Sequence, residues 1–326
     1  MKIACIIATY NGEAYLESQI ESILHQQYGS EEKNQMDIYI RDDGSTDSTI
    51  SIVEGFRKRN KQIHLMNDGR NHLGPKKSFY KLLTYVQNYD YVFFSDQDDI
   101  WVDDKVHILL SSFDNSAVVI PQLVFSDAWI ADEYGKSTNQ AMSQRYMWPN
   151  KQPNLQFLTM NYQITGATMV INQAATNLIN KVDENIKENS YMHDSFIGLL
   201  IAACGHVHRI NRPLIFYRQH ADNVVGTVKQ SGISLARFTS ITATLSHLVN
   251  DNILLFEYLM KDSNMKKMST RSLKVVEKYL TSFKEIQQSK PISVRRIKAI
   301  AEIKQNIWPK GLPTWIRLFL LFITRF

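Results

Sequence analysis

The stretch Tyr91-Val-Phe-Phe-Ser-Asp-Gln-Asp-Asp-Ile-Trp101 decides the fold of this chain. Its first four residues are apolar, and such a short continuous run predicts a strand that is buried on both faces of a sheet. The run ends in Asp96-Gln97-Asp98, so the acidic side chains follow the strand directly. In α/β proteins with a parallel sheet, ligands bind beyond the carboxyl ends of the strands. We therefore expect a functional site at the end of this strand.

The residues before this stretch repeat the same order of strand, polar loop and helix. Strands are predicted over residues 2–8, 38–40 and 63–66, and amphipathic helices over 13–27, after residue 47 and over 78–87. This alternation predicts the α/β class with a doubly wound, mostly parallel sheet flanked by helices. Further on, we expect strands over 162–171 and 215–218 and a helix over 191–204, with helices beyond residue 230.

Polar clusters follow three of the predicted strands. They are Thr9-Tyr-Asn-Gly12, Asp42-Asp-Gly-Ser45 and Asp96-Gln-Asp98. Because the carboxyl ends of parallel strands meet at one edge of the sheet, these clusters are expected to lie close together.

The composition is that of a globular protein. Hydrophobic residues make up 44% and charged residues 21% of 326 residues, which excludes a disordered chain, a fibrous repeat and a polytopic membrane protein. Cys5 and Cys204 lie in apolar segments, predict buried thiols and fit a reducing cytoplasm. Two cysteines also exclude a disulfide framework and a cysteine-based zinc cluster. The first nine residues do not resemble a signal peptide.

The charge divides the chain into two expected regions. Residues 227–326 contain 17 Lys and Arg against 6 Asp and Glu, whereas residues 1–226 contain 20 against 26. The charge predicts two regions with different roles, an acidic one over 1–226 and a basic helical one over 227–326. The last segment, 315–326, is too short to span a bilayer. It is expected either to lie on a membrane surface or to form a contact within the domain or with a second copy of the chain.

The acidic clusters have both functional and structural interpretations. Asp96 and Asp98 are the hard oxygen ligands that Mg²⁺ or Mn²⁺ prefers, although an Asp-x-Asp is also common in turns and helix caps. In the second cluster, Ser45 or Thr46 is expected to cap the following helix, with Asp47 in its first turn. The chain contains neither a GxGxxG nor a GxxxxGK[ST] motif, so a dinucleotide fold and a P-loop are not supported.

Together these motifs resemble the family 2 glycosyltransferases with the GT-A fold. The resemblance rests on Thr9-Tyr-Asn-Gly, Arg41-Asp-Asp-Gly-Ser-Thr-Asp and Phe94-Ser-Asp-Gln-Asp-Asp-Ile-Trp, in that order and spacing. Met192-His-Asp-Ser-Phe196 and the stretch 216–226 are similar to the bacterial rhamnosyltransferase-like branch. The resemblance covers about residues 1–225, and it implies a Rossmann-like GT-A domain followed by a helical C-terminal extension.

The resemblance implies roles for individual residues. Asp194 matches the general base, and Asp96, Asp98 and His220 match the metal side of the site. Asp43, or its neighbour Asp42, would contact the base of the nucleotide. The other residues expected to bind the nucleotide sugar are Thr9, Tyr10, Asn11, Asn71, Gly74, Lys77, Asp96 and Trp101. Gly74 also fits a simple turn, and Trp101 fits equally a wall of the sugar pocket or packing beneath the metal loop.

The implied activity is the inverting, Mn²⁺- or Mg²⁺-dependent transfer of a sugar from a nucleotide-diphosphate donor. The acceptor would be a hydroxyl of a bacterial surface polysaccharide, a glycoprotein glycan or a lipid-linked glycan. The first candidate donor is dTDP-rhamnose, and the alternatives are UDP-glucose and UDP-galactose. A catalytically inert nucleotide-sugar-binding scaffold is the second class considered. Nucleic-acid binding is not expected, because the basic residues of the C-terminal region are spread among apolar helical positions.

Overall fold

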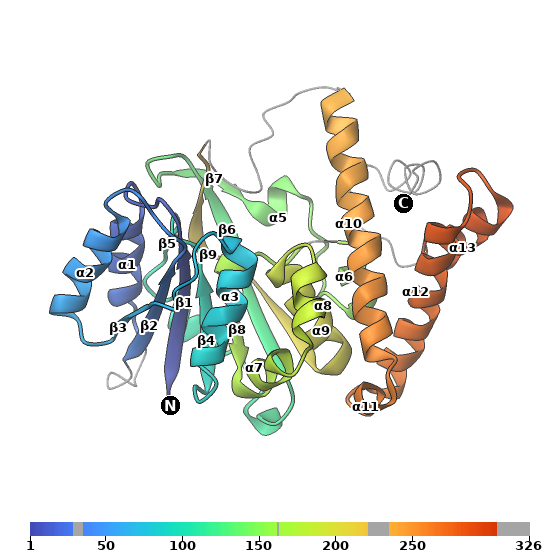
Figure 1. Ribbon diagram of the computed structural model, residues 1–326, viewed down its shortest axis with the longest axis horizontal. Helices are drawn as coiled ribbons and strands as arrows, with labels where there is room; N and C mark the ends of the chain where they lie inside the picture. Colours follow the sequence, from blue (N-terminus) through green and yellow to red (C-terminus); the bar gives the residue numbers. More distant parts are fainter. Residues whose placement is uncertain (29–34, 162, 221–234, 305–326) are drawn as a thin grey trace. The chain divides into compact units, whose positions relative to one another are not determined.

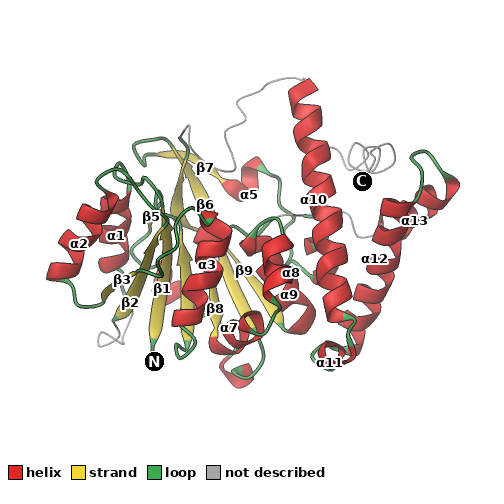
Figure 2. Cartoon of the chain, in the orientation of Figure 1, coloured by secondary structure: helices red, strands yellow, loops and turns green. Residues whose placement is uncertain are grey.

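The computed structural model describes residues 1–28, 35–161, 163–220 and 235–304, drawn in colour in Figures 1 and 2. The chain divides into two compact units. Unit 1 comprises residues 1–145, 164–182 and 206–227, and unit 2 comprises residues 146–163, 183–205 and 228–326. Besides the C-terminal helices, unit 2 thus takes in two segments that the sequence analysis assigns to the first 226 residues.

Unit 1 is built on a mixed nine-stranded sheet with the order β3-β2-β1-β4-β8-β6-β9-β5, in which β7 also pairs with β6. The strands are β1 (Ile3–Thr9), β2 (Met36–Asp42), β3 (Ile63–Met66), β4 (Tyr91–Ser95), β5 (Ile100–Trp101), β6 (Gln122–Ala131), β7 (Ser137–Ala141), β8 (Met169–Asn172) and β9 (His206–Arg218). The first four strands in this order are parallel, as are β6 and β9, whereas β8 is antiparallel to both of its neighbours. The predicted α/β class and the first four predicted strands are confirmed.

Helices cover the sheet of unit 1, and the first three of them lie where the apolar periodicity of the sequence predicts helices. They are α1 (Leu16–Leu24), α2 (Thr49–Arg59), α3 (Gly74–Tyr85), α4 (Lys105–Leu110), α5 (Met142–Arg145) and α7 (Gln173–Asn180). Helix α3 packs on β1 and β2, and α7 packs on β4 and β8. Helix α3 begins four residues earlier than predicted, because Pro75 occupies the first turn, where a missing N–H costs little.

Two predicted strands in the second half of unit 1 have different bounds. The strand expected over 162–171 begins only at Met169, because Gly166–Thr168 form a 3₁₀ turn. Strand β9 is longer than the expected 215–218, since it pairs in parallel with β6 from His206 onward.

The register of the parallel strands brings the polar clusters to one edge. Thr9 at the end of β1 pairs with Asp42 at the end of β2, and Ile7 pairs with Ser95 at the end of β4. The loops after these strands therefore start at nearly the same level of the sheet. This confirms that the three clusters share one edge.

Unit 2 is helical. Its helices are α6 (Leu155–Leu158), α8 (Glu184–Asn189), α9 (His193–Cys204), α10 (Leu235–Leu259), α11 (Asp262–Met265), α12 (Thr270–Gln288) and α13 (Val294–Lys304). Helix α10 packs on α8, α9 and α12, and α12 packs on α13. Phe256, Tyr279 and Phe283 are buried in this core. The expected helices over 191–204 and beyond residue 230 are confirmed where the structure describes them.

Across the described helices, none combines the length and apolar character that a membrane span requires. The segment 315–326, for which a membrane or protein contact is expected, lies outside the described residues.

Arg218, the last residue of β9, connects three parts of unit 1. Its side chain is buried, its Nε donates a hydrogen bond to the carbonyl of Asp98 at 2.7 Å, and its Nη1 donates to the carbonyl of Glu133 at 3.0 Å. Nη2 donates to Oγ of Ser18 in α1 at 3.1 Å, and the backbone N–H donates to Oδ1 of Asp99 at 3.0 Å. The acidic loop after β4 is therefore held by a residue about 120 positions away.

We expect Arg218→Lys to destabilise unit 1 and to loosen the acidic loop. Lysine keeps the charge but cannot reach three acceptors in a fixed fork, so buried carbonyls lose their donors. The free energy of unfolding should fall by about 2–4 kcal/mol. Amide hydrogen exchange over residues 96–101 should accelerate in the same variant.

The matched control is Arg212→Lys in the same strand, where the side chain is 53% exposed and forms an ion pair with Asp104. This variant should stay within about 0.5 kcal/mol of the parent, as surface substitutions generally do. Equal exchange rates in the two variants would contradict the role of Arg218.

Candidate functional site at the carboxyl edge of the sheet

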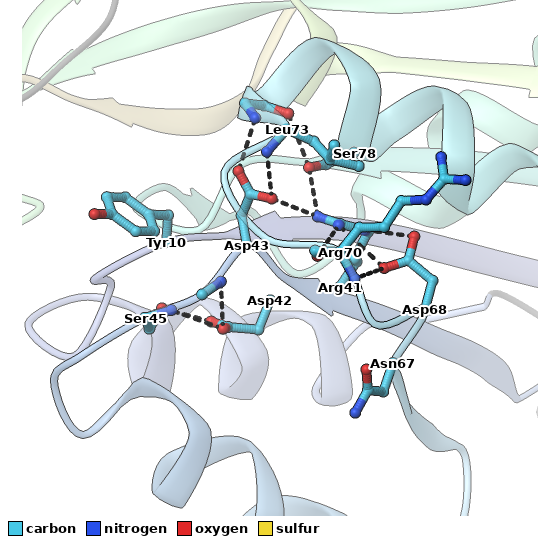
Figure 3. Close-up of polar contacts among 12 residues, drawn as sticks. Tyr10, Arg41, Asp42, Asp43, Ser45, Asn67, Asp68, Arg70, Leu73 and Ser78 are labelled. Atoms are coloured by element: carbon cyan, nitrogen blue, oxygen red, sulfur yellow. Dashed lines mark hydrogen bonds and ion pairs between the residues drawn. The ribbon is translucent and has the colours of Figure 1, made fainter.

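Asp43 is a buried carboxylate at the end of β2. Its Oδ1 accepts hydrogen bonds from Nη1 of Arg41 at 2.7 Å and from the backbone N–H of Leu73 at 2.9 Å. Its Oδ2 accepts from the N–H of Gly74 at 2.7 Å. Burial by itself raises the pKa of Asp43, but the hydrogen bonds from Arg41, Leu73 and Gly74 outweigh it, and the pKa lies below its ordinary value. Asp43 is therefore ionised at neutral pH, and it holds the start of α3 against β2 (Figure 3).

Arg41 in β2 binds the residues around Asp43. Its guanidinium is only 1% exposed and also forms an ion pair with Asp68 at 3.2 Å. Nη2 donates to the carbonyl of Arg70 at 2.6 Å, and Nη1 donates to Oγ of Ser78 in α3 at 2.9 Å. Because the carboxylates of Asp43 and Asp68 face the buried Arg41 cation, these charges are compensated within the protein.

Asp42 has a different environment from Asp43. Its Oδ2 accepts hydrogen bonds from the N–H groups of Gly44 at 2.9 Å and Ser45 at 2.8 Å, and its Oδ1 accepts from the Ser45 hydroxyl. These contacts make an Asx turn, and Gly44 adopts the left-handed conformation that the turn needs, with φ +94°. Of the two adjacent carboxylates, Asp42 thus has a turn-forming role.

The loop after β1 is bound to the same turn. Asn11 adopts φ +47°, its N–H donates to Oγ of Ser45 at 2.8 Å, and its Oδ1 accepts from the N–H of Thr46 at 2.9 Å. Asp47 accepts from the N–H of Thr49 at 3.0 Å at the start of α2. Helix α2 begins at Thr49 with Ser48 at its N-cap, so the expectations that Ser45 or Thr46 caps it and that Asp47 lies in its first turn are wrong.

Gln97 connects the first and third clusters, and it is not among the site residues predicted from the sequence. Its Oε1 accepts hydrogen bonds from Oγ1 of Thr9 at 2.7 Å and from the N–H of Tyr10 at 2.9 Å. Its Nε2 donates to the carbonyl of Tyr10 at 3.1 Å. A side chain at Gly12 would collide with the Gln97 amide, which would then have to move away from Thr9 and Tyr10. The only signal in the sequence was an amide between two carboxylates at a strand end.

Asp98 and His220 meet at this edge. Oδ2 of Asp98 lies 2.7 Å from Nε2 of His220, and the two side chains are 17% and 7% exposed. The imidazole packs against the Tyr15 ring at a tilt of 30°, with ring centroids 4.6 Å apart, and the Arg218 guanidinium lies over the same Tyr15 ring at 4.8 Å. Tyr15 therefore orients the His220 ring, and Arg218 holds both Tyr15 and the backbone of Asp98.

Asp96 is not grouped with this pair. Among the described residues, no three His, Cys, Asp or Glu side chains stand close enough to hold a metal ion by themselves. Of the three expected metal ligands, the structure thus brings together Asp98 and His220. A ligand such as a diphosphate would have to supply further oxygen atoms.

Below the acidic loop lies a buried polar layer. Asp99 is 1% exposed, and burial, together with the charges of Asp98 and Asp96, raises its pKa well above the ordinary value. Lys105 is fully buried, donates to the carbonyl of Ala167 at 2.7 Å, and has a pKa lowered to about 7 by burial.

Trp101 belongs to this layer rather than to the surface. It is 2% exposed, and the Lys105 ammonium lies 3.6 Å from the centroid of its ring. Of the two interpretations of Trp101, this burial favours packing beneath the metal loop.

The remaining expected ligands of the nucleotide sugar lie around Asp43. Tyr10 is 46% exposed, with its ring edge-on to His72 at 5.8 Å, whereas Thr9 is buried against Gln97. Asn71 is exposed and packs under Gly44, and Lys77 is half-buried in the first half of α3. Of the residues expected to bind the nucleotide sugar, Tyr10, Asn11 and Asn71 are thus exposed, and Lys77 and Asp96 are partly exposed.

Asp194 belongs to unit 2. It lies in the first turn of α9, where its Oδ1 accepts a hydrogen bond from the N–H of Ser195 at 2.7 Å. The helix begins at His193, two residues after the start expected from the sequence, and Asp194 lies in its first turn, where the helix dipole favours a negative charge.

Comparisons with known proteins agree with this architecture. The chain is 31% identical over 229 residues to a dTDP-rhamnosyl transferase, RfbG, of Shigella flexneri, covering 68% of this chain and 73% of that protein. Its fold is similar to that of Staphylococcus aureus TarS residues 1–349 in complex with UDP, with a TM-score of 0.54 at 17% identity over 94% of this chain and 81% of that one. The chain spans 50% of the longer TarS chain.

A mannosyltransferase of Pyrobaculum calidifontis, solved with GDP-Man and Mn²⁺, shares the fold as well. Its TM-score is 0.51 at 15% identity, over 97% of this chain and 78% of that one. The model of the family described as "Glycosyl transferase family 2" matches residues 4–176, more than half of the chain. The sequence motifs, the sheet with its acidic edge and this match lead to one conclusion: the chain belongs to glycosyl transferase family 2.

Proposed function

We propose that this chain transfers rhamnose from dTDP-rhamnose, with inversion, to a hydroxyl of a bacterial surface polysaccharide or glycoprotein glycan. The observation that carries the reaction type is the Asp98–His220 pair, 2.7 Å apart at the edge where β1, β2 and β4 end. The donor is supported by the 31% identity to a dTDP-rhamnosyl transferase. UDP-glucose and UDP-galactose are the alternative donors, and an inert donor-binding scaffold is the alternative function.

The accessible side chains around Asp43 support donor binding. Asp43 is ionised and only 6% exposed, while Tyr10 beside it is 46% exposed. In the proposal, Tyr10 provides an apolar face for the base and Asp43 accepts a hydrogen bond from it. Asn11 and Asp42 support this pocket indirectly, because they hold the loops that form it.

The donor set at Asp98 and His220 fits Mn²⁺ or Mg²⁺. The Asp98 carboxylate is the kind of hard oxygen ligand that these cations prefer, His220 beside it would be the second protein ligand, and the diphosphate of the donor would supply the further oxygen atoms. A bound divalent cation would neutralise the diphosphate that leaves from the donor sugar. Tyr15 and Arg218 keep His220 and the backbone of Asp98 in place for this role.

In the proposed reaction Asp194 is the general base. A carboxylate that removes the proton of the acceptor hydroxyl during attack makes that hydroxyl a competent nucleophile. Attack on the face opposite the diphosphate inverts the anomeric centre, and no covalent intermediate with the enzyme is needed. We place this activity in the cytoplasm, at the inner face of the membrane where a lipid-linked acceptor is available.

A donor screen tests the proposed function directly. The purified chain is incubated with Mn²⁺ and dTDP-rhamnose, UDP-glucose, UDP-galactose or UDP-N-acetylglucosamine, and release of the nucleoside diphosphate is measured. We expect release from dTDP-rhamnose at least tenfold above the others. Preference for a UDP-sugar would reject the donor, and binding without release from any of the four would favour the scaffold.

Asp98→Asn should weaken Mn²⁺ binding, measured calorimetrically in the presence of dTDP, by at least about tenfold. The amide keeps the shape of the side chain but lacks the charge that a divalent cation requires. The matched control is Asp104→Asn, a partly exposed carboxylate that pairs with Arg212. Unchanged turnover in excess EDTA would show that the reaction needs no metal.

Asp194→Asn should reduce transfer by about 10²–10⁴-fold while donor binding persists, because the amide cannot accept the acceptor proton. Asp183→Asn is the control in the same unit. The Asp183 side chain is 64% exposed, and its carboxylate lies at the long distance of 3.9 Å from the Lys261 ammonium. A transfer assay and calorimetry on the same preparations separate the two effects. Near-normal turnover of Asp194→Asn would remove this residue from the mechanism.

A further inference from the structure

The corner between α12 and α13 in unit 2 is held by a buried arginine. Arg296 is 1% exposed, and its Nη2 donates to the carbonyls of Ile286 at 2.5 Å and Ser289 at 2.7 Å. Its Nε donates to Oγ of Ser289 at 3.2 Å, and its N–H donates to Oγ of Ser293 at 3.3 Å. The backbone on both sides of the corner is therefore fixed, and so are the side chains that it presents.

This corner exposes three aliphatic side chains. Ile292 is 67% exposed, Val294 is 68% exposed and Ile297 is 50% exposed. Ile292 also adopts φ +59°, a left-handed conformation that is an outlier for a β-branched residue. Glycine or asparagine would fit this position without strain. Strained positions of this kind cluster at functional sites.

The sequence of this corner carries positive charges, one of which is paired with a carboxylate of α12. Lys290, Arg295 and Lys298 are exposed, and residues 286–301 contain no Asp or Glu. Arg295 approaches Glu285 at 3.5 Å, whereas no ion pair to Lys290 or Lys298 is found within the described residues. The corner thus combines an apolar tip with a surrounding positive charge.

We propose that this corner docks on an anionic lipid bilayer. The aliphatic side chains would enter the boundary between headgroups and acyl chains, and Lys290 and Lys298 would meet the headgroups. A second copy of the chain fits less well, because a two-fold contact would place these cations against themselves. Protein-binding surfaces are also rich in Trp and Tyr, which this corner lacks. The proposal does not depend on the sugar donor or the acceptor.

The test is flotation of the full chain with vesicles of phosphatidylcholine alone or with 30% phosphatidylglycerol added. We expect recovery with the anionic vesicles only, weakened by salt. Ile292→Asn should lower the partition coefficient about tenfold, and it should keep the fold because asparagine tolerates the left-handed conformation. Lys290→Gln with Lys298→Gln should lower it about twenty-five-fold, close to fivefold for each cation.

Val119→Asn is the matched control. Val119 is 85% exposed in unit 1, and its replacement should leave recovery unchanged. Circular dichroism checks that each variant is folded, and light scattering reports its mass. Equal recovery of the parent and both corner variants would overturn the proposal, as would recovery that ignores the lipid charge. A fall in mass with unchanged lipid binding would assign the corner to a second copy instead.

Discussion

The register between β1 and its two neighbours is the constraint on which the site in unit 1 depends. Thr9 lies opposite Asp42 and Ile7 lies opposite Ser95, so three chain segments leave the sheet side by side. A shift of one residue in either pairing would exchange the two faces of a strand and disrupt the packing on both of them. Since Ile7, Phe93 and Phe94 are fully buried, the core itself enforces this register. Hydrophobic packing of the strands thus determines where the acidic loops lie.

Concentrating carboxylates at one edge creates repulsion that the protein resolves in a different way at each position. Asp43 is neutralised by Arg41, and its pKa is lowered. Asp42 is satisfied by the N–H groups of its own turn. Asp99 is buried, and its raised pKa favours the uncharged form. Asp98 remains beside His220 with partial exposure, so the charge that is left for a ligand is localised there.

The sequence predicted what depends on local pattern and missed what depends on distant contacts. Strands β1 to β4 and the shared edge followed from apolar runs that end in polar clusters. The clamp between Gln97 and Thr9 joins residues 88 positions apart, and no periodicity reports it. The role of Arg218 was equally hidden, because an arginine at the end of a strand is normally solvated. The burial of Trp101 depends on where Lys105 packs, so its two interpretations could be separated only in three dimensions.

Three loops of this protein are held by buried arginines. The hydrogen-bond partners of these three side chains explain why arginine is used. Arg41 faces two carboxylates, whereas the guanidinium groups of Arg218 and Arg296 bind backbone carbonyls and hydroxyls. One planar guanidinium with five donors can satisfy several carbonyls at once, which a lysine ammonium on a flexible stem does less well. Hydrogen bonds to neutral acceptors fix the position of the guanidinium but leave its positive charge uncompensated. Arg218 therefore adds a positive charge beside Asp98 and Asp99, and Arg296 adds one beneath the basic corner of unit 2.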